Sequence, residues 1–300
     1  MASSAVRTAL VLSGFASLVH YSVAFAPNYN KVSLSTRAEL KMTNSPSITD
    51  MSVHPSAAIA NPPPTKTAAG VIFDIDGTLA DSWRLGYDAT VVVLKNNNLG
   101  HVPIDEEIYH ATCVYPTPER LARTAGLTPT DDNFESLGQE LGRQFDEHYV
   151  QLVSSKTAGF YDGIMDILQN LPDETKLGCL TNACVAYGHA VLEANCPVKE
   201  NTGTYALYDR FGAIHGADSV PAAKPSPEGL LQCAKELQLQ PEDCIYVGDA
   251  IGDGKAARAA GMVSIGVLWG SNSEEKLRNA NVFDYIVSSR EELRDLLPQQ

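Results

Sequence analysis

Two aspartates near residue 70 stand one residue apart at the end of an apolar run. Residues 71–79 read VIFDIDGTL, so Asp74 and Asp76 close a predicted β-strand. Side chains alternate along a strand, and both carboxylates therefore lie on the same side. Two anions at the mouth of a buried strand are costly unless a cation or a proton compensates them, and Gly77 lets the backbone approach a ligand closely. The pattern favours a charged ligand site over a polar strand end followed by an ordinary turn.

Three later segments also end a predicted strand with polar residues. They are Thr181 and Asn182 after a strand at 177–180, Lys224 in the loop after a strand at 212–215, and Asp249 and Asp253 after a strand at 244–247. Taken singly, a strand-end threonine is often a cap, a loop lysine is often solvated and Gly-Asp is often a turn. Ligands of open α/β sheets bind at the carboxyl ends of the strands, so we expect all four segments to meet at one functional site.

The elements that must position these residues alternate along the second half of the chain. Further strands are predicted at 264–268 and 285–287, and helices at 226–238, 253–260, 273–280 and 289–297. Ser226 is the expected N-cap of the first of these helices, with Pro227 in its first turn. Strand–helix alternation with strands that are apolar on both faces predicts an α/β fold, a doubly wound parallel sheet.

Residues 82–160 interrupt this alternation with helical periodicity and no convincing strand. Helices are predicted at 83–96, 105–112, 118–124 and 132–152. We predict a small all-helical domain inserted after the first strand, which divides the core domain into residues 70–81 and 161–298. Its position beside the carboxylate pair favours a lid over the site, and a plain structural excursion is the alternative.

The first 68 residues have the composition of targeting segments. Residues 1–24 carry Arg7, an apolar run and a small-residue cleavage site, which predicts a signal peptide. Residues 25–68 are rich in Ser and Thr and predict a transit peptide and linker. The tandem resembles the bipartite presequences of algae with complex red plastids, in which a junction like Ala-Phe-Ala-Pro at 24–27 marks the cleavage point. We expect a plastid location, and secretion is the alternative.

Charge is divided between the two parts of the chain. Residues 1–68 hold five basic and two acidic residues, which leaves 17 of 22 basic and 34 of 36 acidic residues for the remainder, a net charge of −17. No basic stripe exists to meet phosphate backbones, so nucleic acid and, for the mature form, an anionic membrane are excluded as partners. A small phosphorylated substrate needs local positive charge from a metal and a few lysines.

Four motifs, FDIDGTL, LTN, KP and GDAIGD, stand in the order found in the haloacid dehalogenase superfamily. The resemblance covers essentially all of residues 70–298. The helical insertion resembles the four-helix cap of phosphoglycolate phosphatase and β-phosphoglucomutase relatives. Within that group LGCLTN, KPSPEGLL and GVLWGSNSEEKL most resemble the phosphoglycolate phosphatase branch.

The resemblance implies a Mg²⁺-dependent phosphomonoester hydrolase that works through an aspartyl-phosphate. Asp74 corresponds to the nucleophile and Asp76 to the general acid and base, whose presence favours phosphoryl transfer over dehalogenation. The implied Mg²⁺ ligands are the Asp74 carboxylate, the Asp76 backbone carbonyl and the Asp249 carboxylate, with Asp253 in support. The implied phosphate contacts are the Thr181 hydroxyl, the Lys224 ammonium, Asn182 and the Gly77 amide.

The insertion is expected to select the substrate beyond its phosphate. The candidate contacts are Arg84, Tyr87, Tyr115 and Arg120, the last at a helix start that could face the site. A plastid location makes 2-phosphoglycolate the substrate of first choice among small phosphorylated metabolites. A β-phosphoglucomutase-like mutase and a pyrophosphatase or nucleotidase stay open as alternatives, whereas the intact set of motif residues disfavours a non-catalytic binding protein.

Overall fold

The computed structural model describes residues 65–100, 104–196 and 207–300. A six-stranded sheet of order β5-β4-β1-β6-β7-β8 forms the centre, and every pair of neighbouring strands is parallel. The strands are β1 (Gly70–Phe73), β4 (Lys176–Leu180), β5 (Phe211–His215), β6 (Cys244–Gly248), β7 (Val263–Val267) and β8 (Tyr285–Val287). The chain runs from β1 to one side of the sheet and then crosses to the other, so the predicted doubly wound α/β class is confirmed.

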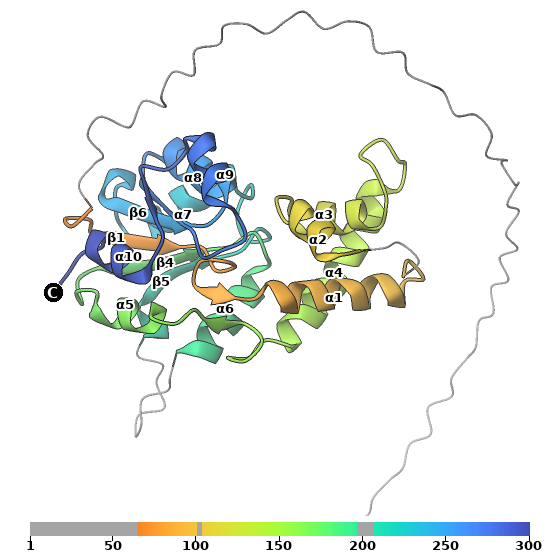
Figure 1. Ribbon diagram of the computed structural model, residues 1–300, viewed down its shortest axis with the longest axis horizontal. Helices are drawn as coiled ribbons and strands as arrows, with labels where there is room; N and C mark the ends of the chain where they lie inside the picture. The colour runs from red at the N-terminus through yellow and green to blue at the C-terminus, as the bar shows by residue number, and fades with distance from the viewer. Residues whose placement is uncertain (1–64, 101–103, 197–206) are drawn as a thin grey trace, which may run out of the picture. The chain divides into compact units, whose positions relative to one another are not determined.

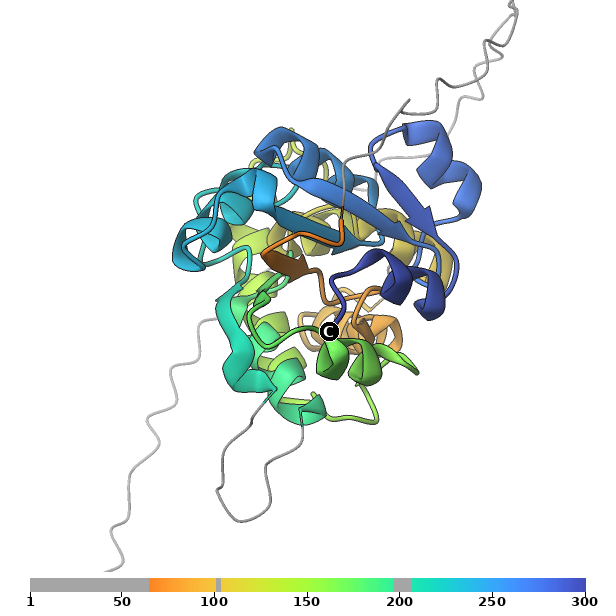
Figure 2. The ribbon, with the colours of Figure 1, turned by 90° about the vertical axis from the view of Figure 1, so that its left-hand side faces the viewer.

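Helices cover both faces of this sheet (Figures 1 and 2). They are α5 (Ile164–Asn170), α6 (Val185–Asn195), α7 (Glu228–Glu236), α8 (Ile251–Ala260), α9 (Glu274–Ala280) and α10 (Arg290–Leu296). Alternate residues of β1 enter two cores, since Val71 and Phe73 pack with α5, α6 and α10 whereas Ile72 packs with α7 and α8. A strand that is buried on both faces needs apolar residues at every position, which explains the unbroken apolar run.

The register of β1 fixes where the polar segments meet. Phe73 is paired with Cys179 of β4 and with Val247 of β6. The Asp74 amide continues this ladder with a hydrogen bond of 2.9 Å to the Val247 carbonyl. The residues that follow these three strands therefore lie at one edge of the sheet, next to the point where the strand order reverses, as predicted.

Four helices fill the insertion, namely α1 (Trp83–Asn96), α2 (Glu106–Thr112), α3 (Thr117–Thr124) and α4 (Phe134–Gln151) (Figure 1). Helix α4 packs against α1 and α3. Gly138 and Gly142 allow the close contact with α3, because a Cβ at Gly138 would lie 2.6 Å from the Pro118 carbonyl oxygen. The four helices predicted within residues 82–160 are confirmed. Their assignment to a separate inserted domain, with borders at residues 82 and 160, stays a prediction.

Two local predictions are wrong. A short strand β3 (Gly159–Phe160) lies in the segment predicted to hold no strand, and it pairs antiparallel with β2 (Ala80–Asp81). Two residues are too few for any alternation pattern to show. Ser226 is not the N-cap of α7, because the helix begins at Glu228 with Pro227 as its N-cap, and the Ser226 amide is used in a preceding turn to Ala223.

The folded part includes residues before β1. Thr65 is buried and Ala68 packs against the core. The Ala69 amide donates to Asp243 at 2.9 Å, and its carbonyl accepts from the Lys176 amide at 3.0 Å. The predicted signal peptide (1–24) and the predicted transit peptide and linker up to residue 64 lie outside the described residues. No helix in the described ranges is long and apolar enough to cross a bilayer.

Candidate active site

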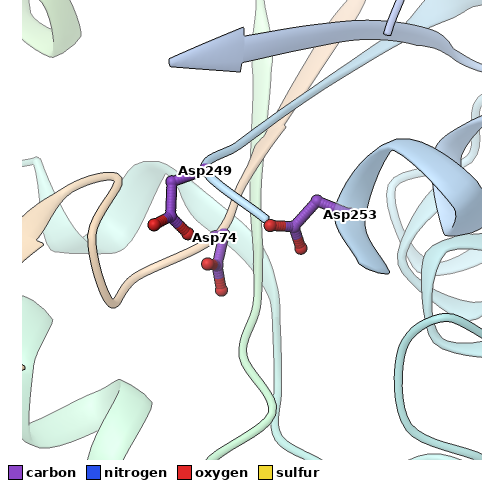
Figure 3. Close-up of side chains that lie close together, drawn as sticks. All are labelled: Asp74, Asp249 and Asp253. Carbon is purple, nitrogen blue, oxygen red and sulfur yellow. The ribbon is translucent and has the colours of Figure 1, made fainter. Parts of the chain in front are cut away.

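Three buried carboxylates converge at the carboxyl edge of the sheet. Asp74 follows β1, Asp249 follows β6, and Asp253 lies in the first turn of α8 (Figure 3). One oxygen atom of each lies within 4.8 Å of the others. Their residues are 5%, 5% and 1% exposed, so water screens their mutual repulsion poorly. Oxygen ligands from several carboxylates are what Mg²⁺ prefers in proteins, and the donor set therefore fits that ion.

Lys224 supplies the positive charge inside this cluster. Its Nζ donates to Asp74 Oδ1 at 2.7 Å and lies 2.8 Å from Asp253 Oδ1. Burial lowers the pKa of Lys224, but the carboxylates of Asp253 and Asp74 outweigh burial and raise it above its ordinary value. The ammonium group is therefore retained, held on its other side by the Tyr246 hydroxyl at 2.9 Å.

One ammonium does not balance three carboxylates. Burial, followed by the charges of Asp253 and Asp249, raises the pKa of Asp74 well above its usual range, although Lys224 opposes this shift. Burial and Asp253 raise the pKa of Asp249 to about 7, against a hydrogen bond from the Ser271 amide. These upward shifts in pKa mark an excess of negative charge that a bound divalent cation would relieve, which is a second reason that Mg²⁺ fits here.

Two glycines leave room for the Asp249 side chain. A Cβ at Gly77 would lie 2.5 Å from Asp249 Oδ2, and one at Gly270 would lie 2.2 Å from the same atom. Gly77 also has φ +74°, a conformation that favours glycine. The Gly77 amide donates to the Ala80 carbonyl at 3.0 Å. Because the N–H is already used in this hydrogen bond, the structure gives no support to the predicted contact between the Gly77 amide and phosphate.

Asp76 lies apart from the three carboxylates and is held by hydroxyl groups. Its side chain accepts from Tyr187 at 2.6 Å, from Tyr149 and Thr181 at 3.2 Å each, and from Ser82. Burial first, and then the charge of Asp76, raises the pKa of Tyr149 and of Tyr187 well above the usual range, so both phenols stay protonated donors. The two rings stack with centroids 4.2 Å apart and join α4 of the insertion to α6 of the core.

Asn182 acts on the loop that carries Lys224. Its side-chain amide donates to the Lys224 carbonyl at 3.1 Å, and its Oδ1 accepts from the Lys224 amide at 3.0 Å. These two hydrogen bonds fix the backbone of the lysine. The predicted contact of Asn182 with phosphate stays a prediction.

A cavity of about 560 Å³ joins the carboxylate edge to the helical insertion. All the predicted core residues line it, and so do Tyr115 and Arg120 of the insertion. Arg84 and Tyr87 do not line it, because Arg84 pairs with Asp88 at 3.1 Å on the surface and Tyr87 donates to the Ile104 carbonyl. Sequence reasoning missed Ser82, Trp83, Tyr109, His110, Phe145 and Tyr149 in the wall, and Tyr187 and Tyr246 behind it, because isolated residues of these types form no motif.

Similarity to known proteins agrees with this geometry. The model of the haloacid dehalogenase-like hydrolase family matches residues 71–267. Phosphoglycolate phosphatase of Shigella dysenteriae serotype 1 (strain Sd197) is 30% identical over 245 residues, which cover 76% of this chain and 91% of that protein.

Solved structures share the fold at lower identity. A haloacid dehalogenase-like family hydrolase of Streptococcus pneumoniae superimposes with a TM-score of 0.59 at 22% identity, covering 76% of this chain and 97% of that one. CbbY from Rhodobacter sphaeroides in complex with phosphate gives a TM-score of 0.60 at 22% identity, covering 75% and 96%. From the family match and the 30% identical relative, the chain belongs to the haloacid dehalogenase-like hydrolases and is a phosphatase of the branch that resembles phosphoglycolate phosphatases.

Proposed function

We propose that this phosphatase is a Mg²⁺-dependent phosphomonoester hydrolase of small phosphorylated metabolites, with 2-phosphoglycolate as its substrate. The observation that carries the proposal is the buried cluster of Asp74, Asp249 and Asp253 around Lys224. A cavity of about 560 Å³ suits a small metabolite. The choice of 2-phosphoglycolate is supported by the 30% identical relative and by the predicted plastid location.

The chain supplies a nucleophile and a proton carrier. A carboxylate oxygen of Asp74 attacks phosphorus, the bond from phosphorus to the ester oxygen breaks, and Asp76 gives its proton to the leaving alkoxide. In the second half Asp76 takes a proton from water as the water oxygen attacks the phosphorus of the aspartyl-phosphate. Inorganic phosphate leaves and Asp74 returns as a carboxylate.

Charge compensation decides whether the attack can occur. A carboxylate and a phosphate charge repel by about 4 kcal/mol at ~4 Å with an effective dielectric constant of ~20. Lys224 neutralises part of this charge, and the Thr181 hydroxyl contacts a phosphoryl oxygen. When bound to Asp74, Asp249 and the Asp76 carbonyl, with Asp253 in support, Mg²⁺ would supply the remaining positive charge.

Metal dependence tests the proposal directly. Phosphate release from a panel of phosphorylated metabolites is measured with the purified protein in Mg²⁺ buffer, in excess chelator, and after Mg²⁺ is added back. We expect turnover to stop on chelation and to return with the metal, since the carboxylates cannot approach a phosphate uncompensated. Full activity in excess chelator would reject the proposed metal site. Transfer of phosphate between positions of a sugar without release would favour the mutase.

We also propose that the presequence predicted at residues 1–68 directs the chain to a plastid, with its last four residues, 65–68, belonging to the folded domain. The support is compositional: an apolar run with a cleavage site at 1–24, followed by a basic, Ser- and Thr-rich segment. A fluorescent tag at the C-terminus, observed in cells of an alga with a complex plastid, tests this. Signal in the culture medium would support secretion instead.

A further inference from the structure

Arg120 is a buried cation in the wall of the active-site cavity. It lies on α3 of the insertion, is 5% exposed, and lines the same cavity as Asp74 and Lys224. Its guanidinium carbon is 4.5 Å from the centroid of the Phe145 ring and 5.5 Å from that of Tyr109. Packing against two rings restricts the orientation of the guanidinium group.

The guanidinium group is poorly satisfied by the described part of the protein. One of its five N–H donors forms a hydrogen bond there, from Nη1 to Thr90 Oγ1 at 2.8 Å. No carboxylate oxygen of the described residues lies within 4.0 Å of it. Arg123, one turn further along the same helix, pairs instead with Glu119 at 2.7 Å. Of the two arginines of α3, Arg123 therefore has a carboxylate counter-ion, whereas Arg120 has none among the described residues.

Asp146 interacts electrostatically with Arg120 but does not form a direct ion pair with it. The charge of Arg120 lowers the pKa of Asp146, but burial and then the charge of Asp218 raise it more, to about 6. An unpaired buried charge costs several kcal/mol in general. A guanidinium is always charged and binds carboxylate and phosphate oxygens in pairs, so an anion that enters the cavity would complete its contacts.

We propose that Arg120 binds a second anionic group of the substrate, a carboxylate or a second phosphate, remote from the phosphoryl group that is transferred. The inference rests on the proposed function and deepens it. The core wall of the cavity holds four aspartates around the buried Lys224, and two exposed lysines, Lys255 and Lys276, also line it. Among the described residues of the insertion, Arg120 is the one Lys or Arg that lines the cavity. The protein thus selects phosphate esters that carry negative charge at both ends.

Binding and turnover separate this inference from the proposed function. In an Asp74→Asn background, which prevents turnover, titration calorimetry in Mg²⁺ buffer measures the affinity for 2-phosphoglycolate, a sugar bisphosphate and ethyl phosphate. Ethyl phosphate is the ester of 2-phosphoglycolate without its carboxylate. Arg120→Met is added to remove the charge, and Arg123→Met is the matched control on the same helix.

We expect at least one anionic ester to bind about 30-fold or more tightly than ethyl phosphate, because truncating a buried charged hydrogen bond costs 2 kcal/mol or more. Arg120→Met should remove most of this difference, and Arg123→Met should leave it in place. Which of the two anionic esters loses affinity identifies the carboxylate or the phosphate as the partner. Arg120→Lys, which keeps the charge without the planar fork, should show a partial loss.

Two outcomes would overturn the inference. One is equal affinity for all three esters in the Asp74→Asn background, a result that needs no further variant. The other is a loss in Arg120→Met and Arg120→Lys that is the same for ethyl phosphate as for the anionic esters, since a damaged fold does not discriminate between ligands. The proposed function is tested separately by phosphate release with the unmodified protein, so each idea can fail alone.

Discussion

At the scale of single residues, the site is organised by the pairing of unlike charges at Asp74 and Lys224. The lysine lies 150 residues from the aspartate in sequence, yet the two side chains meet at 2.7 Å with both nearly excluded from water. A buried pair of this kind contributes little to stability, because the cost of desolvation offsets much of the attraction. In the proposed reaction its value is in holding the Asp74 carboxylate in a fixed place, from which it would attack phosphorus.

The division of roles between the two aspartates of FDIDGTL is open to test. Asp74→Asn removes the nucleophile, so neither turnover nor aspartyl-phosphate should be detected. Asp76→Asn keeps the nucleophile but removes the proton donor, and should lower hydrolysis of an alkyl phosphate by about 10²- to 10⁴-fold.

An activated aryl phosphate sharpens the contrast, because its leaving group needs no proton. With this substrate Asp76→Asn should recover the first step in part and accumulate a trappable aspartyl-phosphate. Rapid quenching and detection of the phosphorylated protein provide the measurement. Equal losses in both variants with no trapped intermediate would mean that Asp76 serves structure alone.

Tyr187 gives a second test at this scale. Its side chain is fully buried and donates to Asp76 at 2.6 Å. Tyr187→Phe keeps the ring that stacks on Tyr149 but removes a hydrogen bond to a charged group, which is worth about 1.5–3 kcal/mol. We expect kcat to fall by about 10- to 100-fold with little change in KM.

The matched control is Tyr208→Phe, whose hydroxyl meets His189 at 2.7 Å and which does not line the cavity. It should leave kcat unchanged. A normal kcat in Tyr187→Phe, or an equal fall in both variants, would show that the hydrogen bond to Asp76 has no part in positioning that carboxylate.

At the scale of elements, helix α4 of the insertion meets helix α6 of the core beside the site. Tyr149 of α4 and Tyr187 of α6 meet on Asp76, and Asp146 of α4 lies near Cys184, the N-cap of α6. One oxygen atom of Asp146 is buried without a hydrogen-bond partner in the described structure. The α4–α6 contact therefore contains both the tyrosines that donate to Asp76 and the Asp146 carboxylate, which has a buried oxygen without a partner.

The charge of Asp146 predicts a pH-dependent stability. Burial first, and then Asp218, raises the pKa of Asp146 from 3.8 to about 6. The folded state thus binds this proton more tightly than the unfolded chain, and the resulting stabilisation is full below pH 3.8 and is lost as pH rises through about 6. At pH 7.5, Asp146→Asn should raise the free energy of unfolding by on the order of 1–3 kcal/mol, and the melting temperature should rise with it. At pH 4.5 the substitution should change both quantities little.

Thermal melts of the wild-type protein and the variant at both pH values measure this difference. Asp132→Asn, a substitution at an exposed position, is the control and should have a small effect that does not vary with pH. An Asp146→Asn effect of equal size at the two pH values would contradict the assignment of a buried, shifted carboxyl group.

At the scale of the whole molecule, the chain joins a folded phosphatase to a proposed presequence. The described structure begins at Thr65, which is buried, and Ala69 makes two backbone hydrogen bonds to the sheet region. Apart from the apolar run within residues 1–24, the preceding segment is basic and rich in Ser and Thr, a composition that we expect to add nothing to this core. Folding should therefore depend on residues from 65 onward.

Two truncations test that expectation. A chain that starts at Thr65 should melt at the temperature of the full chain, whereas one that starts at Gly70 should melt several degrees lower. Each hydrogen bond lost at Ala69 is worth about 0.5–1.5 kcal/mol, and 1 kcal/mol shifts the melting temperature of a domain of this size by about 2–4 °C. A large loss of stability in the longer truncated chain would show that the presequence takes part in the fold.

The sequence alone determined the residues that form the site and the sheet that brings them together. Asp74, Thr181, Lys224 and Asp249 each follow an apolar strand, and the carboxyl ends of parallel strands meet at one edge. The helices predicted at 273–280 and 289–297 begin at Ser273 and Ser289, whose hydroxyls accept from backbone amides of α9 and α10. Such features depend on a few neighbouring residues, and a periodic pattern or a cap is enough to predict them.

Only the tertiary structure decided which side chains surround that site. Tyr149 lies 73 residues from Asp76 and Tyr187 lies 111 residues from it, and neither belongs to a motif. The burial of Arg120 between two rings likewise depends on the packing of three helices, and the two-residue ladder of β2 and β3 is too short to leave a pattern. Contacts between distant segments arise from packing, so a local pattern of residue types does not predict them.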